Sequence, residues 1–581
     1  IDAADAAHLD PGRPGLALVR RGGGLEPVQI AHTGWLADLD PAATPVVRAV
    51  PWHGGAAPPP EPAAHMPTAL PQLVAGVRRA AEQLPDRAPL RWPWLPPLPR
   101  LVMLSELDVS GSETAIGLLD LPDRQLQLPY RIDLAETGNT AIVGSPRSGR
   151  STTLQTIAVS LARVHSPQDL RLFCLDGGGQ LEPLRRLPHC DAIVAADDIE
   201  HLYRVFRRLR AEVRARRHKS GPRLVLLLDS WETIRDALDE VEHTELLVTL
   251  TGLLREASVQ AFVSGDRSLL ASRLSGAFRT RLVLALTDVS DYALAGIARR
   301  EIPEELPPGR ALLPSGGELQ LAVVDREFRP EAIYHAIAEI SQCWRGTVYD
   351  SFAVRRLPNH VSARELDPAG GRWRLPLGLG GDSLNTVELD LSETKAGLVA
   401  GGPGSGKTSA LAAMARAAER QGLFVVIVGQ EFGPSVAVAP GLPVAIDERQ
   451  LRKLIEARGS ALVVADDVEL LRDTELDSAL AGLIADRRHR VVLAGDAAEL
   501  AAAFRGCIAE ARRRRNGLLL APGPGDGELF GQAKLTKLVS TGLGAPGRGI
   551  LVQRGRAVTL QLANVDPYVD SDGPRAAQTS P

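Results

Sequence analysis

Lysine, cysteine and aromatic residues are scarce in this chain of 581 residues. It holds only six Lys against 60 Arg, and 4% of its residues are aromatic. The four cysteines form no C-x-x-C pair, so we expect no disulfide frame and a reducing compartment. The formal net charge of −4 does not predict a surface that seeks nucleic acid, although it leaves room for a local basic stripe.

Long apolar runs and a signal peptide are also absent. No run approaches the length that a membrane-spanning helix needs. With 44% hydrophobic and 23% charged residues, the sequence predicts a globular protein, and its length predicts two to four domains. Because the chain begins with Ile1 and not with Met, we expect it to be part of a longer protein.

One of the few lysines lies in a complete phosphate-binding loop. Residues 401–408 read GGPGSGKT, which matches G-x-x-x-x-G-K-[ST], between a predicted strand (396–401) and a predicted helix (409–418). Glycines let successive backbone N–H groups surround a phosphate at the start of a helix. The lysine is expected to reach the β- and γ-phosphates of ATP, and the threonine hydroxyl to ligate Mg²⁺. The predicted nucleotide-binding residues of this intact loop are Gly401, Gly402, Pro403, Gly404, Ser405, Gly406, Lys407, Thr408 and Ser409.

An altered copy of the loop stands earlier in the chain. Residues 144–151 read GSPRSGRS, with arginine in place of the lysine. A planar guanidinium is a poor substitute for a compact ammonium between two phosphates. Two interpretations stay open: weak or regulatory ATP binding, and a loop kept only for its fold. The predicted nucleotide-binding residues of this altered loop are Gly144, Ser145, Pro146, Arg147, Ser148, Gly149, Arg150, Ser151 and Thr152, together with Asp229 farther along the chain.

Acids at strand ends are expected to complete both sites. The apolar segments 223–228 and 461–465 end at Asp229 and Asp466, which can hold Mg²⁺. An acid one position farther on can polarise the attacking water, and the second copy has Asp467 there. We therefore predict catalytic roles for Asp466 and Asp467 and Mg²⁺ ligation by Thr408, Asp466, Ser151 and Asp229.

An internal repeat divides the chain. The pattern P-G-R, strand, glycine turn, strand with Gln predicts a β-hairpin at 11–31, 308–322 and 546–563. Strands and helices alternate between each loop and its hairpin, which predicts two α/β domains with doubly wound, mostly parallel sheets. The predicted divisions are the end of a preceding ATPase domain (1–36), a helix and proline-rich linker (37–100), a first module (101–330), a second linker (331–360), a second module (361–566) and a disordered tail (567–581).

One block of residues resembles a known family. The segment IGLLDLPDRQLQLPYRIDL from Ile116, the altered loop, Cys174-Leu-Asp-Gly-Gly-Gly and Leu187-Pro-His resemble the FtsK/SpoIIIE ATPases, and most closely the type VII secretion motors of EccC/EssC type. The resemblance implies RecA-like domains, ATP and Mg²⁺, a homo-hexamer at the inner face of the cell membrane reached through an N-terminal part outside this chain, other membrane subunits, and WxG-type helical-hairpin substrates. Departures are Arg150 and the segment Gly429-Gln-Glu-Phe, where Asp-x-Gly-Gly is expected.

We therefore expect an ATP-binding motor or coupling subunit with weak or regulatory ATPase activity. Two alternatives stay open, an FtsK-like DNA translocase and a scaffold that binds nucleotide without hydrolysing it, although duplex DNA is not an expected partner. Salt-dependent DNA binding would favour the translocase. Arg279 and Arg281 are either arginine fingers for a neighbouring subunit or ordinary surface arginines.

Both linkers carry apolar residues held extended by proline, and such segments need a surface to lie on. They either pad their own domain or dock in a groove of a neighbouring module. We expect the strip Trp92, Trp94, Leu95 and Leu98 to occupy a groove on the first module. A like groove on the second module is expected to accept the apolar C-terminal signal of a secreted protein. The more polar segment 355–361 should then be held less firmly.

Overall fold

The computed structural model divides the chain into two compact units, Ile1–Trp94 and Leu95–Pro581. The structure describes residues 15–21, 24–30, 70–83, 95–107, 114–134, 136–216, 221–239, 244–327, 329–349, 351–429, 441–456, 458–523, 525–531 and 546–564. Trp92, Trp94 and the predicted tail (567–581) lie outside these residues. No helix in the described ranges is long and apolar enough to cross a membrane.

The first unit contains the first of the three predicted hairpins. Strand β1 (Leu16–Arg21) pairs antiparallel with β2 (Gly24–Gln29), which confirms a hairpin in this part of the chain. Helix α2 (Leu70–Glu82) lies in the region that precedes the proline-rich linker.

The first module of the second unit is built on an 11-stranded sheet. Its strand order is β5-β4-β13-β12-β11-β6-β10-β9-β7-β8, and β3 pairs with β13 beside this path. The six strands from β11 to β8 are parallel, and β5, β4, β13 and β12 add an antiparallel part. The strands are β3 (Val102–Met103), β4 (Thr114–Leu121), β5 (Leu126–Ile132), β6 (Thr140–Val143), β7 (Leu170–Asp176), β8 (Cys190–Ala195), β9 (Arg223–Asp229), β10 (Val259–Gly265), β11 (Thr280–Val283), β12 (Arg310–Leu312) and β13 (Glu318–Val323).

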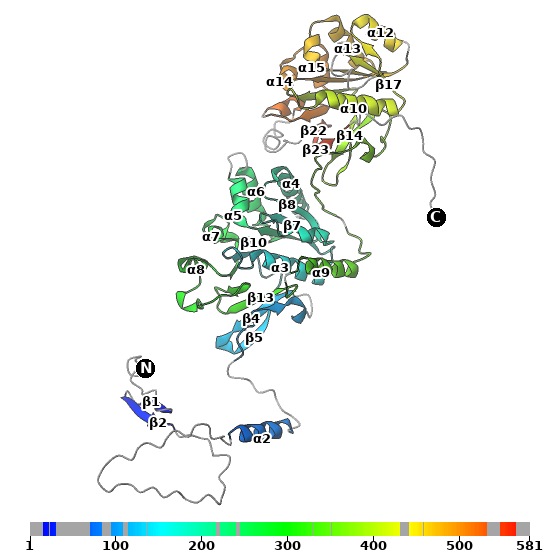
Figure 1. The fold of residues 1–581 in the computed structure, drawn as a ribbon. Coiled ribbons are helices and arrows are strands. Elements are labelled where there is room, and N and C mark those ends of the chain that lie inside the picture. Colours follow the sequence, from blue (N-terminus) through cyan, green and yellow to red (C-terminus); the bar gives the residue numbers. More distant parts are fainter. Residues whose placement is uncertain are drawn as a thin grey trace, which may run out of the picture. The chain divides into compact units, whose positions relative to one another are not determined.

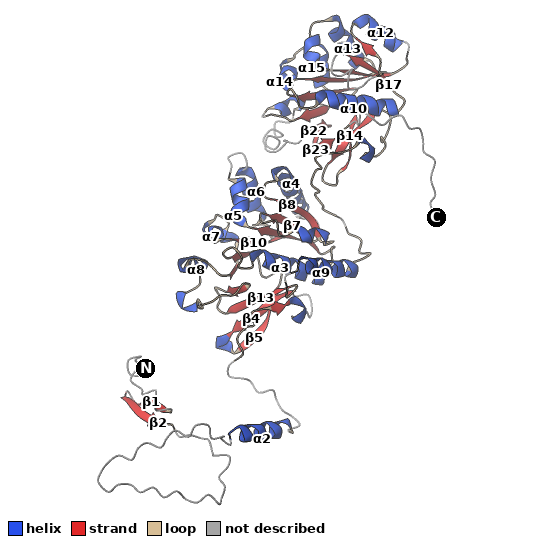
Figure 2. Cartoon of the chain, in the orientation of Figure 1, coloured by secondary structure: helices blue, strands red, loops and turns tan. Residues whose placement is uncertain are grey.

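Helices cover both faces of this sheet, since its buried residues form two main clusters (Figures 1 and 2). One cluster includes apolar residues of α3 (Arg150–Val164) and α9 (Pro330–Cys343). The other includes residues of α4 (Ile199–Ala215), α5 (Trp231–Leu238), α6 (Thr244–Leu253) and α7 (Arg267–Ala271). Short helix α8 (Val289–Ala295) contributes to a smaller cluster. Strands buried on both faces explain apolar runs such as RLVLLL in β9.

The second module repeats the arrangement with ten strands in the order β15-β14-β23-β22-β21-β16-β20-β19-β17-β18. The strands are β14 (Arg374–Gly380), β15 (Asn385–Asp390), β16 (Ala396–Gly401), β17 (Phe424–Val428), β18 (Val444–Ala445), β19 (Ala461–Ala465), β20 (Arg490–Gly495), β21 (Gly517–Leu520), β22 (Arg548–Gln553) and β23 (Arg556–Leu562). Helix α10 (Lys407–Arg420) covers one face, and α12 (Glu448–Glu456), α13 (Glu475–Ala485), α14 (Ala497–Ala502) and α15 (Gly506–Arg512) cover the other.

Every strand of the second path has a counterpart at the same place in the first, from β5 and β15 at one edge to β8 and β18 at the other. The predicted fold class is thus confirmed: two mostly parallel α/β sheets in tandem, each with a closing hairpin, β12–β13 or β22–β23. In both sheets the strand before the phosphate-binding loop is central, at the point where the chain switches direction across the sheet. Ligands of such sheets bind at that place, beyond the carboxyl ends of the strands.

The described part of the first linker lies on the first module. Leu98 is buried, and the guanidinium of Arg310 donates to the carbonyl oxygens of Leu98 and Pro99, both at 3.1 Å. Gln127 donates to the carbonyl of Pro96 at 2.7 Å. Arg310 belongs to the P-G-R motif, so the repeated hairpin motif itself holds the preceding linker.

The second linker also carries buried side chains, and how firmly it is held relative to the first linker stays a prediction. Val354, Leu357 and Val361 are buried in spite of the polar residues between them. The backbone N–H of Val354 donates to the carbonyl of Asp191 at 3.1 Å, and the ring of His201 hydrogen bonds with the carbonyl of Val354 at 2.6 Å. Three buried aliphatic side chains and these backbone contacts anchor the segment where its composition alone did not indicate it.

Candidate nucleotide-binding sites

The intact loop follows β16, the central strand of the second module, and leads into α10. Gly401 lies so close to its neighbours that a Cβ there would meet the hydroxyl of Ser405 at 2.5 Å and the carbonyl of Leu520 at 2.7 Å. Gly406 has φ +96°, a left-handed conformation that side chains disfavour. The motif glycines are therefore required by close approach and by backbone conformation.

The chemistry-bearing side chains of the intact loop meet the predicted strand-end acid. The ammonium of Lys407 donates to the carbonyls of Gly401 and Gly402 at 3.0 and 3.1 Å. The hydroxyl of Thr408 donates to Oδ2 of Asp466 at 2.7 Å. Since Mg²⁺ prefers oxygen ligands, a hydroxyl and a carboxylate converging at a helix N-terminus fit a magnesium nucleotide. The buried hydroxyl of Ser405, which lacks a hydrogen-bond partner among the described residues, adds a polar group to this cradle.

The second predicted acid, Asp467, is exposed and has a left-handed backbone with φ 47°. Its backbone N–H donates to Oδ1 of Asp466 at 3.1 Å. Partial burial and the adjacent Asp466 carboxylate raise the pKa of Asp467 above its ordinary value, although the Lys407 ammonium opposes the shift. This carboxyl group lies beside Asp466, the predicted metal ligand, and its raised pKa makes it more basic than a free aspartate.

Glu469 is a polar residue of this site that sequence reasoning missed. Its Oε1 accepts from the backbone N–H of Asp496 at 3.2 Å, and its buried Oε2 has no hydrogen-bond partner among the described residues. A Cβ on Gly495 would lie 2.4 Å from that Oε2, so the glycine leaves room for the carboxylate. The available signal was the shared spacing, because both modules have a glutamate three positions after the strand-end aspartate, Glu232 and Glu469.

The altered loop occupies the same place at the end of β6 in the first module. The hydroxyl of Ser151 donates to Oδ2 of Asp229 at 2.8 Å, as Thr408 does to Asp466. Ser264 donates to the other carboxylate oxygen at 2.5 Å. Burial raises the pKa of Asp229, and the hydrogen bonds from Ser264 and Ser151 oppose that shift. The structure thus brings the predicted ligand pair Ser151 and Asp229 together, with a second hydroxyl that the sequence did not reveal.

Arg150 points to a different partner from that of Lys407. Its Nη2 lies 2.8 Å from Oε1 of Glu232, and both side chains are largely buried. The other oxygen of Glu232 accepts from the backbone N–H of Asp266 at 3.2 Å, and Nη1 of Arg150 is buried with no hydrogen-bond partner among the described residues. The guanidinium is therefore neutralised by a carboxylate of its own module.

Other residues of the altered loop are exposed or hydrogen bond with segments outside the loop. Arg147 is exposed with φ 65°, where the intact loop has Gly404 with φ 72°. The carbonyl of Ser148 accepts from the backbone N–H of Gly309, at 2.9 Å, so the P-G-R turn packs against the loop. Ser145 shares a hydrogen bond with Thr287 at 2.8 Å. The first contact ties the loop to the turn that starts the closing hairpin, and the second ties it to the segment between β11 and α8.

Two residues with an open role lie away from the loop of their own module. Arg279 precedes β11 and Arg281 lies within it, and the start of β11 pairs with the start of β6, with Thr280 opposite Thr140. The altered loop follows the other end of β6. Among the described residues there is also no cluster of three or more His, Cys, Asp or Glu that could hold a metal ion. A P-loop magnesium would instead use one hydroxyl and one carboxylate together with water and phosphate oxygens.

Comparisons with known proteins agree with this geometry. Residues 110–243 match the FtsK/SpoIIIE family, and residues 386–514 match an AAA domain. The folds, the loops and these matches define the class that the chain resembles: two α/β domains in tandem, each with a phosphate-binding loop and each similar over part of its length to a P-loop ATPase domain.

Its relatives are secretion proteins. ESX-1 secretion system protein EccCb1 of Mycobacterium tuberculosis is 28% identical over 366 residues, 56% of this chain and 62% of the relative. ESX secretion system protein EccC of Thermomonospora curvata is 28% identical over 371 residues, 55% of this chain and 28% of the relative. Type VII secretion system protein EssC of Staphylococcus aureus is 23% identical over 347 residues, 52% of this chain and 23% of the relative. The chain is thus related to the EccC and EssC type VII secretion proteins, and its matches span less than two thirds of each of these.

Solved structures show the same fold. EssC (ATPases 2 and 3) of Geobacillus thermodenitrificans aligns with a TM-score of 0.59 at 20% identity, over 81% of this chain and 100% of that chain. EccC (ATPases 2 and 3) of Thermomonospora curvata, in complex with a signal sequence peptide, aligns with a TM-score of 0.51 at 23% identity, over 81% of this chain and 97% of that chain. The two modules therefore have the fold of a tandem ATPase pair.

Proposed function

We propose that this chain supplies two ATPase modules of a type VII-like secretion motor and couples nucleotide binding to the recognition of secreted proteins. The observation that carries the proposal is the intact loop, in which Lys407, Thr408 and Asp466 are assembled, joined to a first module of the same fold whose loop is altered. The relationship to EccC and EssC supports the secretion role. The modules would act in the cytoplasm, at the inner face of the membrane, in a homo-hexamer with other channel subunits.

In the second module, the loop would bind ATP through polar groups that hydrogen bond with one another in this structure. Lys407 would exchange the carbonyls of Gly401 and Gly402 for β- and γ-phosphate oxygens. The hydroxyl of Thr408 and the carboxylate of Asp466 would hold Mg²⁺ and its water. Bound Mg²⁺ neutralises phosphate charge as the γ-phosphoryl group is transferred.

Hydrolysis by the isolated chain should be slow. Asp467 would polarise the attacking water, but its carboxylate is exposed and sits on a side chain one methylene shorter than that of glutamate. Ring motors complete their sites with an arginine from a neighbour, and that arginine is worth a factor of about 10³–10⁵ in rate. We expect turnover to appear only in the assembled ring, so that phosphate release by the monomer at about 1–100 s⁻¹ would contradict the proposal.

The first module has a second candidate role, as a nucleotide-binding element without turnover. The ion pair between Arg150 and Glu232 favours this role, because the arginine at the position of the motif lysine is already bound to a carboxylate. Ser230, where the second module has Asp467, also removes the adjacent acid.

A fluorescent ATP analogue tests the nucleotide roles in the 581-residue chain. Lys407→Ala should abolish the tighter phase of binding, whereas Arg150→Ala should leave that phase unchanged. Equal loss in both variants, or no loss in Lys407→Ala, would contradict the assignment of the second module as the principal ATP site.

Secreted WxG-type helical hairpins are the proposed substrates. A related EccC was solved with a signal sequence peptide, and we extend that recognition to the second module of this chain. Calorimetry of the chain with apolar C-terminal signal peptides should show binding that changes little with salt, since buried apolar surface and not charge drives it. Duplex DNA is the control: steeply salt-dependent DNA binding without peptide binding would instead support a translocase.

A further inference from the structure

A cavity of about 350 Å³ opens beside the altered loop of the first module. Its volume is at the lower end of the range for small-molecule sites, about 300–1,000 Å³. Arg147 and Gly149 of the loop, Thr152 on the first turn of α3, and Pro308 and Gly309 of the P-G-R turn line it. A ligand there would therefore touch the loop itself.

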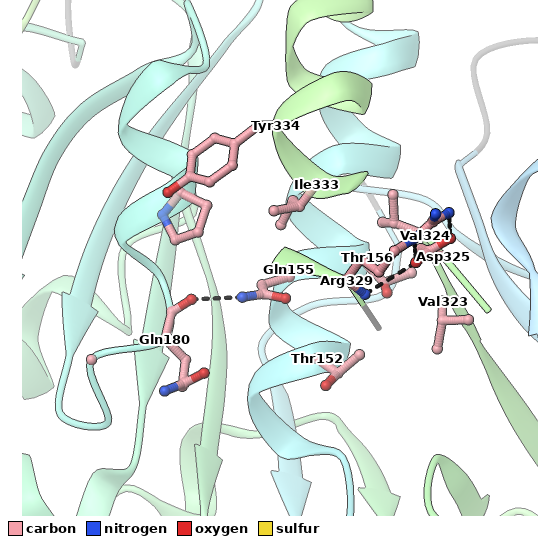
Figure 3. A pocket seen from close by; sticks show the side chains of 12 residues that line it. Thr152, Gln155, Thr156, Gln180, Val323, Val324, Asp325, Arg329, Ile333 and Tyr334 are labelled. Carbon is pink, nitrogen blue, oxygen red and sulfur yellow. Dashed lines mark hydrogen bonds and ion pairs between the residues drawn. The ribbon is translucent and has the colours of Figure 1, made fainter. Parts of the chain in front are cut away.

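A second cavity, of about 340 Å³, continues along the outer side of α3. It shares Thr152 with the first cavity and reaches Ile333 and Tyr334 of α9. Figure 3 shows Thr152 and Gln155 on one helix and Ile333 on the next, with the Gln155 amide donating to the carbonyl of Gln180, a bond of 2.6 Å. The two cavities share Thr152 and Val323 as lining residues and so adjoin one another; together we treat them as one groove beside the phosphate-binding loop, whose volume fits a sugar and a base.

The cation of the altered loop that faces this groove is Arg147, and not Arg150, which stands at the position of the motif lysine. Arg150 is paired with Glu232 at 2.8 Å, so its guanidinium is already engaged by a carboxylate of its own module. Arg147 is exposed, lines the cavity, and has no hydrogen bond or ion pair with a described residue. A guanidinium at the cavity side of the loop can contact the phosphates nearest the ribose.

We infer that the first module binds an adenine nucleotide by its nucleoside and its first two phosphates and does not distinguish ATP from ADP. The inference rests on the proposed nucleotide binding and adds which parts of the nucleotide this site contacts. The γ-phosphate of ATP would gain no side-chain cation from Arg150, because a new contact with that guanidinium would first have to break a largely buried ion pair.

The test uses the full chain carrying Lys407→Ala, which removes the second module as a competing site. Calorimetric titration with Mg²⁺ and either ADP or ATP should give dissociation constants within about threefold of each other. Adding Glu232→Gln frees Arg150 while its amide oxygen can still accept from the N–H of Asp266. In that variant ATP should bind about tenfold more tightly than ADP.

A matched pair of substitutions locates the nucleoside. Thr152→Phe would fill the space shared by the two cavities and should abolish binding, whereas Thr152→Ser should preserve it; circular dichroism checks that both variants fold. A tenfold ATP preference in the chain carrying only Lys407→Ala would overturn the inference, as would unchanged binding in Thr152→Phe. Nucleotide binding by the wild-type chain with none after Lys407→Ala would also overturn it, yet would leave the proposed function intact. The proposed function itself fails if the wild-type chain binds neither nucleotide nor signal peptide.

Discussion

A buried ion pair under the second linker provides a quantitative test of how the first module is held together. Arg171 and Asp191 bond bidentately with side chains only 2% and 0% exposed, and Nε of Arg171 lies 2.7 Å from Oδ2 of Asp191. The guanidinium also donates to the carbonyl of Pro188 at 3.1 Å. Asp191 in turn accepts from the backbone N–H of Phe352 at 3.2 Å, so one carboxylate serves both the core and the linker.

Asp191→Ala should destabilise the first module by about 3–5 kcal/mol, because it leaves the Arg171 charge buried and uncompensated. The matched control is Glu182→Ala, which breaks a bidentate pair with Arg185 whose side chains are 57% and 50% exposed. That loss should be about 0–1 kcal/mol, since solvent screens exposed pairs. The expected gap is large against a total stability of about 5–15 kcal/mol for a domain.

Urea denaturation followed by Trp231, which is buried in the first module, measures the difference. Trypsin cleavage after Arg355 or Arg356, both exposed in the linker, should be faster in Asp191→Ala than in Glu182→Ala. Adding Arg171→Met to Asp191→Ala should recover stability, because the unpaired charge is then gone. Equal losses in the two single variants, or linker cleavage at the wild-type rate in Asp191→Ala, would refute this account.

Three further predictions concern separate parts of the chain. Thr408→Ala should weaken Mg²⁺-dependent ATP binding but not Mg²⁺-free binding, because the hydroxyl beside Asp466 is the proposed metal ligand, and titrations with and without EDTA distinguish the two. Gly517→Ala should destabilise the second module, since its methyl group would meet the backbone carbonyl oxygen of Leu398 at 2.1 Å. Gly482→Ala on α13, whose methyl group would meet nothing within 4 Å, should instead stabilise the module by about 0.4–1 kcal/mol; thermal melting tests both variants. Burial lowers the pKa of His189 to about 4, so the unfolded chain takes up a proton at a higher pH than the folded chain does. In urea titrations the first module should therefore lose up to about 3 kcal/mol of stability as the pH falls from 6.5 to about 4. A stability independent of pH over that range, or the same loss in His189→Gln, would contradict the assignment.

Contiguous motifs were predicted well because their chemistry is local. The glycines of the intact loop, Lys407 and Thr408 lie within eight residues, and the strand and helix that flank them follow from apolar pattern and helix propensity. Asp466 could be predicted because a buried strand that ends in an acid places it at the same sheet edge as the loop. The roles of these residues in binding and catalysis stay predictions.

Contacts between distant segments could not be predicted in the same way. Glu232, on the first turn of α5, pairs with Arg150 of the altered loop although the two are far apart in sequence. No pattern marks Ser264, in β10, as a partner of Asp229. The burial of Val354, Leu357 and Val361 in the second linker also depends on the fold, because the polar composition around them does not indicate it.

The amino-acid sequence by itself determined the two tandem α/β modules, the position of each phosphate-binding loop and the inequality between them, since periodicity, glycine spacing and the exchange of lysine for arginine are all properties of the linear chain. Only the tertiary structure decided what that exchange means. It placed Glu232 within 2.8 Å of Arg150, where the equivalent Glu469 keeps a buried oxygen without a hydrogen-bond partner among the described residues. The guanidinium of Arg150 reaches a carboxylate on the first turn of α5, whereas the ammonium of Lys407 donates to the carbonyls of its own loop.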